Sequence, residues 1–401
     1  MAWRNIWRNR RRTLITIASI FFAMLLSLVM RAFQKGSYSH MVKNVVQSYT
    51  GYIQVQDKKY WDEKIIDNSL AYSEETINKI SSVKNVSLVS PRLESFALVS
   101  HGNNTKGAIV LGIDPEAENK LTKLSSKIIS GNMLSEDSRG VLVSERLAKY
   151  LKVELNDTLV LIGQGYHGVS AADKFPVEGI IKIPQPDLDN KLIYLLLPTC
   201  QEFYSAENRL TSISLNINDI EKMNKCKKEI EFALNNEEYA VKTWKDLMPE
   251  LVQMIESDNA GGMIFLFLLY MIIGFGIFGT VLMMTTERKR EFGVIVALGM
   301  QKFKLELILI TEMIIIGILG ILSGIIGSIP IIQYYYHNPL KFAGESAEIF
   351  ENFGFEPIMP MAWQLDYFIE QSIIVIVIII LSVMYPLYSV TRIKVHKALR
   401  T

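Results

Sequence analysis

Residue types that commonly form catalytic or metal sites are scarce in this sequence of 401 residues. It has only five histidines, which are scattered along the chain, and two cysteines. No His-Glu-x-x-His, no Gly-x-Ser-x-Gly and no clustered set of cysteine and histidine is present. We therefore predict no catalytic, cofactor-binding or metal-binding residues. For Cys200 and Cys226 two alternatives remain open, a disulfide or two separate buried thiols.

Two further absences concern ATP and net charge. The phosphate-binding loop G-x-x-x-x-G-K-[ST] does not occur, so ATP-driven work would need a partner that carries such a loop. Lys and Arg together number 42 against 41 Asp and Glu, which gives a net charge of +1. This balance excludes a strongly basic nucleic-acid-binding protein, and we expect no nucleic acid partner.

Charge is also missing from four long stretches of the chain. Residues 13–30, 259–286, 313–336 and 371–391 contain no Asp, Glu, Lys or Arg. Each stretch has 18 or more residues, which is enough for a helix to cross about 30 Å of hydrocarbon. Backbone groups surrounded by lipid must bond within their own segment, so these stretches are expected to be helical. A uniformly soluble globular protein is excluded.

Basic residues resist translocation, so their distribution predicts the orientation of the four spans. They precede the first span without any acid and also follow the fourth, whereas residues 337–366 hold one lysine against five acids. Both termini are therefore expected in the cytoplasm, and the first span is expected to be an uncleaved signal anchor. The predicted order is an interfacial helix over 1–12, spans over 13–33, 259–286, 305–336 and 367–391, an extracytoplasmic domain over 34–258, a short cytoplasmic helix over 287–304, an extracytoplasmic loop over 337–366 and a cytoplasmic tail over 392–401.

The large outside segment combines short β-rich runs with helical ones. Alternating β-branched residues predict strands, for example over 108–113 and 212–217, and capped apolar patterns predict helices, for example over 144–151. The expected fold class is a membrane all-α part of four transmembrane helices, with a large α+β extracytoplasmic domain inserted between helices 1 and 2. Gly163 to Lys174 (GQGYHGVSAADK) are predicted as a Gly-rich loop that is too long for a tight hairpin turn.

Two features concern the membrane segments themselves. Trp3, Ile6 and Trp7 lie on one helical face, which favours a helix in the headgroup region; a basic flank without a defined helix is the alternative. In the third span, Gly320 and Gly324 form a Gly-x-x-x-Gly pair, which favours a close contact between helices. Pro330 and Pro386 predict kinks in spans three and four.

The segment ERKREFGVIVALGMQKFKLE (287–306) predicts a short helix with an apolar face. Gly299 suits a left-handed helix end before a second helix that begins at Gln301. A short helix with an apolar face and charged neighbours is suited to bind in a groove on another protein. The alternative is a reverse turn that packs on lipid. Glu312 is expected to snorkel or to form an ion pair near this segment. The residues of the predicted apolar face are Phe292, Ile295, Val296 and Leu298.

Three motifs give the chain a family resemblance. They are A-W-R-N-x-x-R-N at the N-terminus, E-R-x-R-E-F-G-x-x-x-A-L-G from Glu287, and Y-P-x-Y-x-x-x-R-x-x-x-x-x-A-L-R from Tyr385. With them, the chain resembles the four-span ABC transporter permeases related to FtsX, MacB and the lipoprotein-release proteins LolC and LolE. Residues 143–159 resemble a further segment of that family, with Asn156 where glycine is usual.

The resemblance implies a multi-pass permease of the inner membrane with a periplasmic domain, a second permease subunit in a homodimer or heterodimer, and a dimer of ABC ATPases that binds ATP and Mg²⁺. The chain itself would bind no cofactor and would catalyse no reaction. In this family the ATPases are thought to drive movement of the outside domains. The coupling residues would be Glu287, Arg288, Glu291, Phe292, Ile295 and Leu298.

The size of the outside domain and the absence of a fused ATPase favour the lipoprotein-release type. Membrane lipid and a periplasmic lipoprotein carrier would then be partners. The acyl chains would contact Phe21, Phe22, Met24, Phe265, Phe267 and Met271, and the partner loop would include Gly163, Gly165, Tyr166, His167 and Phe175, although it lacks a proline at its tip. The alternative is a mechanotransmission, regulatory or efflux permease of the FtsX/MacB type that acts on a cell-wall enzyme, a sensor, or the export of small molecules or peptides.

Overall fold

The computed structural model describes the chain except residues 1–6, 9, 236–237, 353–355 and 392–401. Trp3, Ile6 and the predicted tail over 392–401 therefore lie outside the described residues. The chain divides into two compact units. The helical unit comprises Met1–His40, Met254–Lys341 and Ile358–Thr401, and the sheet unit comprises Met41–Gln253 and Phe342–Pro357.

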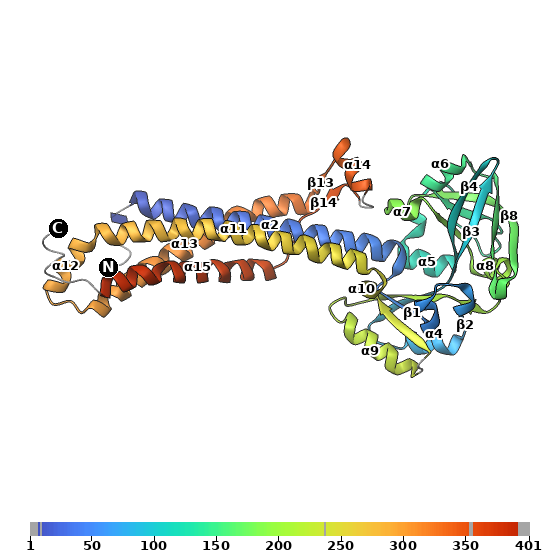
Figure 1. Ribbon diagram of the computed structural model, residues 1–401, viewed down its shortest axis with the longest axis horizontal. Coiled ribbons are helices and arrows are strands. Elements are labelled where there is room, and N and C mark those ends of the chain that lie inside the picture. Colours follow the sequence, from blue (N-terminus) through green and yellow to red (C-terminus); the bar gives the residue numbers. More distant parts are fainter. Residues whose placement is uncertain (1–6, 9, 236–237, 353–355, 392–401) are drawn as a thin grey trace. The chain divides into compact units, whose positions relative to one another are not determined.

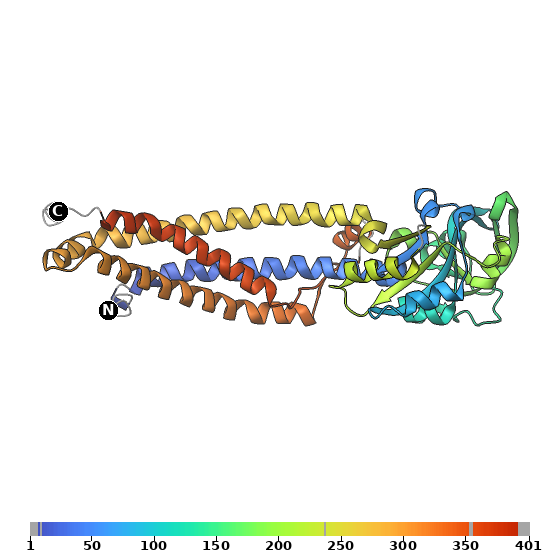
Figure 2. The ribbon, with the colours of Figure 1, turned by 90° about the horizontal axis from the view of Figure 1, so that it is seen from below.

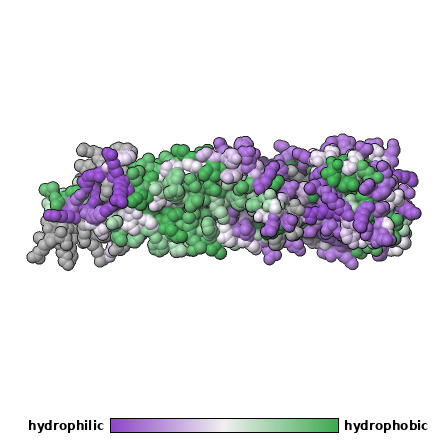
Figure 3. Space-filling model, turned by 90° about the horizontal axis from the view of Figure 1, so that it is seen from above, coloured by the Kyte–Doolittle hydropathy of each residue, from purple (hydrophilic) through white to green (hydrophobic). Residues whose placement is uncertain are grey.

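Among the described residues, four helices are long and apolar enough to cross a membrane. They run side by side along the helical unit (Figures 1 and 2). Their surface in this unit is dominated by hydrophobic residues (Figure 3). The helices are α2 (Arg10–Val45), α11 (Pro249–Glu287), α13 (Lys302–His337) and α15 (Asp366–Thr391); the short helix α12 (Lys289–Ala297) and the two-stranded ribbon of β13 (Leu340–Lys341) and β14 (Ile358–Met359) complete the unit.

Two of these helices are much longer than the spans expected from the sequence. Helix α2 continues beyond residue 33 to Val45, and α11 begins ten residues before position 259, at Pro249. The expected limits were drawn where charged residues begin, but a helix does not end where its hydrophobic stretch ends, because backbone hydrogen bonding continues through polar residues. The segment over 34–258 therefore begins and ends with helix.

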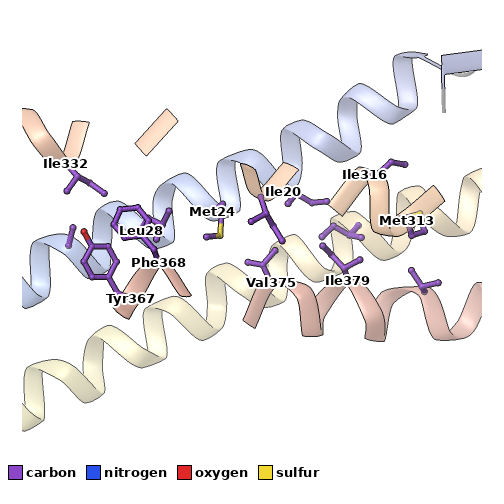
Figure 4. Close-up of a cluster of buried hydrophobic side chains, with 14 of the residues drawn as sticks. Ile20, Met24, Leu28, Met313, Ile316, Ile332, Tyr367, Phe368, Val375 and Ile379 are labelled. Carbon is purple, nitrogen blue, oxygen red and sulfur yellow. The ribbon is translucent and has the colours of Figure 1, made fainter. Parts of the chain in front are cut away.

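Apolar side chains at helical spacing hold the four helices together. Ile20, Met24 and Leu28 of α2 follow one another at intervals of four residues, and all three are fully buried. Figure 4 shows them with the side chains of Ile316 from α13 and Ile379 from α15. Positions four apart lie on one face of a helix, so this face of α2 is the buried one.

Small residues on α13 let α2 approach closely. A Cβ atom built on Gly320 would lie 2.6 Å from Cβ of Ile20, and one on Gly324 would lie 2.4 Å from Cβ of Met24. Such distances leave no room for any larger side chain. The expected close contact at the Gly-x-x-x-Gly pair is therefore confirmed, and its partner is α2. Pro330 and Pro386 both lie within the bounds of helices, α13 and α15.

The sheet unit is built on ten strands that pair in the order β12-β1-β11-β3-β4-β9-β6-β8-β5, while β7 pairs with both β3 and β8. Strands β3, β4, β9, β6, β8 and β7 therefore form a closed ring, and β11, β1 and β12 extend from β3 as an open sheet. The pairs β4–β9 and β6–β8 are parallel, and the other pairs of this sheet are antiparallel. The strands are β1 (Ile53–Asp57), β3 (Val86–His101), β4 (Asn104–Ile113), β5 (Ile128–Gly131), β6 (Val141–Ser144), β7 (Thr158–Gln164), β8 (Ser170–Ile181), β9 (Leu192–Leu196), β11 (Ser212–Ile217) and β12 (Tyr239–Thr243).

Short helices cover this sheet, and a small ribbon joins β2 (Leu70–Ala71) to β10 (Arg209–Leu210). Side chains such as Leu111, Leu142, Ile181 and Tyr194 form a core inside the unit. The helices are α3 (Lys58–Asp62), α4 (Glu74–Ser81), α5 (Pro115–Thr122), α6 (Glu145–Leu151), α7 (Pro186–Asp189), α8 (Leu197–Phe203), α9 (Met223–Leu234) and α10 (Trp244–Leu247), with a π-helical turn η1 (Val46–Thr50) and 3₁₀ turns η2 (Ile66–Asn68), η3 (Leu124–Lys127) and η4 (Tyr166–Gly168). Helix α14 (Glu345–Asn352) belongs to the chain segment between β13 and β14.

Two sequence features of this unit have a direct structural explanation. Asn156 has a φ of 68°, in the left-handed region that glycine adopts freely and that asparagine tolerates best among the other residues. Cys200 and Cys226 are both buried and form no disulfide, so the second alternative, two separate thiols, is correct. Burial raises the pKa of both thiols, which keeps them protonated and unreactive near neutral pH.

The contact at Gly324 predicts a large effect of a small change. We expect Gly324→Val to push α2 away from α13 and to lower the thermal stability of the purified protein in detergent, because overpacking a filled contact costs about 1–3 kcal/mol. Gly279→Val is the matched control, since a Cβ atom there would meet nothing within 4 Å. Equal melting temperatures for the two variants would contradict the packing described here.

Candidate functional site

The connection between α11 and α13 is the part of the helical unit that the sequence singles out. Helix α11 ends at Glu287, α12 occupies Lys289–Ala297 and α13 begins at Lys302. The short helix is thus nine residues long and does not fill the expected range of 287–304. Gly299 has a φ of 96° and Gln301 is the N-cap of α13, so the expected left-handed end and the start of the second helix are both confirmed.

One face of α12 packs against the helical bundle. Phe292 is only 1% exposed and forms a cluster with Leu305 and Leu309 of α13, against which Val296 and Met300 also pack. The guanidinium of Arg288 lies 5.1 Å from the centre of the Phe292 ring. The expectation that Phe292 contacts a partner needs correction, because its side chain is buried between α12 and α13.

The opposite face of α12 is exposed. Leu298 is 83% exposed and Val294, one helical turn earlier, is 42% exposed, while Ile295 is half-buried. Phe303, at the start of α13, is 70% exposed. Of these residues the sequence reasoning named Leu298 and Ile295 and missed Val294 and Phe303. Val294 and Leu298 are four residues apart, and this spacing could have indicated a shared face of the helix. Apolar residues lie all around α12, however, so spacing alone does not show which face the bundle covers.

An ion pair fixes the junction of α11 and α12 to α13. Nη1 of Arg288 lies 2.8 Å from Oε2 of Glu312, and both side chains are largely buried. Nε of Arg288 also lies 3.6 Å from Oε2 of Glu291. The expectation that Glu312 pairs near this connection is therefore confirmed. A buried pair holds its geometry because neither charge has water as an alternative partner.

Two more ion pairs reach this connection from the start of the chain. Arg12 pairs with Glu287, and Arg8 pairs with Glu291. Both acids were expected to face a partner, and in this structure each already has an arginine beside it. These pairs are partly exposed, and exposed ion pairs contribute only about 0–1 kcal/mol, so a partner can replace them at little cost. Trp7, the described member of the expected aromatic face, is exposed.

The residues expected to contact acyl chains do not all lie on the surface. Phe22 on α2 and Phe265, Phe267 and Met271 on α11 are exposed. Phe267 and Met271 also line an apolar groove of about 520 Å³ between α11 and α15. Met24, in contrast, is fully buried against Gly324, and the ring of Phe21 packs against Gly327. Met24 must therefore be removed from the set of lipid contacts, because helix packing uses its side chain.

The expected partner loop is a hairpin. Strands β7 and β8 pair from Thr158↔Pro176 to Gln164↔Ser170, so the expectation of a long loop was wrong. Gly163 lies on β7, and Phe175 lies on β8 with its ring buried beside Phe203. The glycines of residues 163–174 suggested irregular structure, but strands β7 and β8 both continue into this segment with side chains on alternating faces.

Three contacts hold the turn of this hairpin against the rest of the sheet unit. The Tyr166 amide donates to the carbonyl of Tyr204 at 2.8 Å, and the His167 amide donates to Oδ1 of Asp67 at 2.5 Å. Arg209 lies over the Tyr166 ring at 4.6 Å and donates to its hydroxyl. Gly165 is closed in by the backbone of Tyr204, which a Cβ atom would approach to 2.4 Å. The turn is thus a fixed part of the fold.

Family models match most of the chain. A model of the MacB-like periplasmic core domain matches residues 13–232, and a model of the FtsX-like permease C-terminal region matches residues 263–395. The chain belongs to the FtsX/MacB family of ABC transporter permeases. The connection around α12 falls within the FtsX-like match, and the hairpin falls within the MacB-like match.

Individual relatives of this permease are distant but span most of its length. The transmembrane protein LolC of the lipoprotein-releasing system of Xylella fastidiosa (strain 9a5c) is 22% identical over 321 residues, 78% of this chain and 77% of the relative. LolC of Buchnera aphidicola is 22% identical over 96% of this chain and 93% of its own. An uncharacterized ABC transporter permease of Methanocaldococcus jannaschii is 22% identical over 81% of this chain and 80% of its own.

Solved structures resemble part of the permease at low similarity. The periplasmic region of MacB from Actinobacillus actinomycetemcomitans matches at 16% identity and a TM-score of 0.38, over 53% of this chain and 97% of that one. The extracellular domain of the transporter YknZ from Gram-positive bacteria matches at 16% identity and a TM-score of 0.36, over 48% of this chain and all of that one.

The Arg288–Glu312 pair predicts a pattern of stability changes. Arg288→Met should lower the melting temperature of the permease in detergent, because it leaves the Glu312 carboxylate buried without its partner, at a cost of about 3–5 kcal/mol. The double variant Arg288→Met with Glu312→Leu should recover most of the loss. Arg290→Met, at an exposed position, is the control and should melt like the unmodified protein. A double variant as unstable as Arg288→Met would show that charge pairing is not what holds this junction.

Proposed function

We propose that this permease couples ATP hydrolysis on a partner ATPase dimer to the release of lipoproteins from the inner membrane. Membership of the ABC transporter permease family implies an ATPase partner and a second permease subunit. The lipoprotein substrate is our proposal, supported by relatives named LolC that align over most of their length. ATP and Mg²⁺ would bind the ATPase.

The proposed orientation places α12 and both termini in the cytoplasm and the sheet unit in the periplasm. Basic residues support it, because Arg8 and Arg12 pair with Glu291 and Glu287 beside α12, and basic residues resist translocation. The acidic segment between α13 and α15 would then lie on the periplasmic side. In this orientation α12 is within reach of a cytoplasmic ATPase.

The observation that best supports coupling is the two-sided character of α12. Phe292 and Arg288 fix its inner face to α13, while Leu298, Val294 and Phe303 leave an apolar surface exposed beside charged residues. Exposed apolar residues beside charge are typical of a docking site for another protein. A helix so anchored would pass a displacement of the ATPase directly to α11 and α13.

A first experiment tests docking at this surface. We expect Leu298→Asp to abolish co-purification of the ATPase with the permease, because a charge would be buried at the centre of the apolar contact. Ile349→Asp on α14 is the matched control, since Ile349 is also an exposed apolar residue but lies in the sheet unit. If the ATPase is retained by Leu298→Asp to the same extent as by the control, α12 is not its docking site.

A second experiment tests the lipoprotein substrate. In proteoliposomes with the ATPase, release of a labelled triacylated lipoprotein should fall at least roughly tenfold when Phe22→Ala and Phe267→Ala are combined, because both rings are proposed to contact acyl chains. ATPase binding should be unchanged. Ile318→Ala and Leu322→Ala, exposed on α13, together form the control pair.

The result separates the candidate functions. Release that depends on ATP and is lost only in the aromatic variant supports lipoprotein extraction. An unmodified complex that hydrolyses ATP without releasing any lipoprotein would overturn the proposed substrate and would favour the alternative, transmission of force to a periplasmic enzyme or sensor. Carrier binding at Tyr166 and His167 stays a prediction.

A further inference from the structure

Helix α2 enters the sheet unit without a break. The α-helix ends at Val45 and continues as the π-helical turn η1 to Thr50, where the amide of Gly51 donates to the carbonyl of Val46 at 2.8 Å. Gly51 has a φ of 70°, and the amide of the next residue, Tyr52, donates to the carbonyl of Leu215 on β11 at 2.9 Å. Only two residues therefore separate the end of the helix from the start of β1.

The chain between the sheet and helix α11 is not helical throughout. Between α10 and α11 stands Met248, whose φ of −132° and ψ of 63° are not helical. Helix α11 begins at the next residue, Pro249, which has no amide proton to offer. The first residues of α11 thus follow a non-helical residue, whereas the helical turn η1 at the end of α2 is itself bonded to β3 through Tyr49.

A buried arginine holds the π-helical turn. Arg92 on β3 is 1% exposed, and its guanidinium donates to both carboxylate oxygens of Glu118, from Nε at 2.8 Å and from Nη2 at 2.6 Å. Its remaining nitrogen, Nη1, donates to the backbone carbonyl of Tyr49 in η1. The Tyr49 hydroxyl donates to Oε2 of Glu94 at 2.6 Å. Both the backbone and the side chain of this turn are therefore bonded to β3.

Arg92 also occupies a special place in the sheet. Its residue pairs with Ser212 of β11 on one side and with Ile113 of β4 on the other. This is the point at which the open sheet of β11, β1 and β12 meets the closed ring that begins with β3 and β4. A contact made by Arg92 therefore reaches both parts of the sheet unit.

The geometry requires arginine in particular. A guanidinium offers five N–H donors in a fixed planar fork, so one side chain can bond a carboxylate on one edge and a carbonyl on the other. A lysine ammonium is a single point charge that can pair with Glu118 but cannot also span the distance to Tyr49 along the same plane. The Tyr49 carbonyl belongs to the end of a helix, where such groups lack helical partners.

We propose that Arg92, held in place by Glu118, is the positioning residue through which movement of α2 enters the sheet unit. The proposal rests on the proposed function as an ATP-driven permease but not on its substrate. Arg92 acts through Tyr49: it keeps the π-helical turn bonded to the junction of the open sheet and the ring. Without this bond the Tyr49 carbonyl loses its donor from β3, and the turn keeps the bond from its Tyr49 hydroxyl to Glu94 and the chain through Gly51 and Tyr52.

The first test uses Arg92→Lys in the full permease–ATPase complex. The variant keeps a positive charge beside Glu118, so the sheet unit should stay folded, but the Tyr49 carbonyl loses its donor. Hydrogen exchange of the peptide covering residues 46–52 should become at least roughly tenfold faster, since a buried hydrogen bond to a charged group is lost. Arg146→Lys, the same substitution at a partly exposed arginine of α6, should leave exchange of this peptide unchanged.

The second measurement tests transmission. In the unmodified complex, addition of ATP and vanadate should change the exchange of β3 and β11, and Arg92→Lys should remove at least half of this change while ATPase binding and basal hydrolysis persist. A merely structural role of Arg92 would slow or speed exchange equally with and without nucleotide. This readout needs no lipoprotein, so failure of the proposed substrate would not affect it.

A double variant keeps the proposal testable if Arg92→Lys does not fold. Arg92→Met with Glu118→Met removes both charges, and replacement of a buried ion pair by apolar residues of similar size is often tolerated. Lys127 is also near Glu118. Burial lowers the pKa of Lys127 to about 8, although the Glu118 carboxylate acts in the opposite direction and raises it. Faster exchange of residues 46–52 and a reduced nucleotide response in both variants would support the proposal. Unchanged exchange of that peptide, or an unaltered nucleotide response in a folded variant, would overturn it.

Discussion

The close contact between α2 and α13 is the constraint on which the helical unit depends. In lipid there is little hydrophobic force to bring apolar helices together, so their association relies on close packing and on polar contacts. Gly320 and Gly324 provide that packing, because they leave space for the side chains of Ile20 and Met24. With these residues in place, the position of α2 along α13 is fixed to within a fraction of a helical turn, and so are the positions of the charges at both ends of α2.

Those charges meet partners at each end of the helices. At one end Arg12 and Arg8 reach Glu287 and Glu291, and at the other Arg31 lies 3.4 Å from Glu370 of α15, while Lys35 pairs with Asp366. The apolar middle brings the helices close, and the polar ends select one register, since a shift by one turn would separate every pair at once. The Arg288–Glu312 pair does the same for α12 at a more deeply buried position.

The sequence predicts these elements unevenly, for physical reasons. Four uncharged stretches of 18 or more residues predict four long helices, because a helix satisfies its backbone hydrogen bonds within one segment. Gly299 predicts the end of α12 because glycine adopts left-handed backbone angles without strain, and its φ is 96°. The inward direction of Phe292 is not predictable in this way, since it depends on Leu305 and Leu309, which follow in another helix. The ring closed by β7 is likewise invisible in sequence, because strand pairing is long-range and the glycines between β7 and β8 resemble a loop. Arg92 has no local signal at all: a lone arginine in a strand gives no hint of the helix end that it bonds.

The two ends of the proposed mechanical path have different kinds of charge pairing. Near α12, Arg8 and Arg12 hold Glu291 and Glu287 at exposed positions, where water and salt compete and exchange of partners costs little. At η1, Arg92 and Glu118 are almost wholly buried, and separating them would leave two charges without solvent. Exposed ion pairs that can exchange partners suit a surface to which another protein binds. A buried ion pair suits a connection between helix and sheet that keeps its geometry. The burial of these charges thus fits an exchangeable contact near α12 and a permanent one at η1.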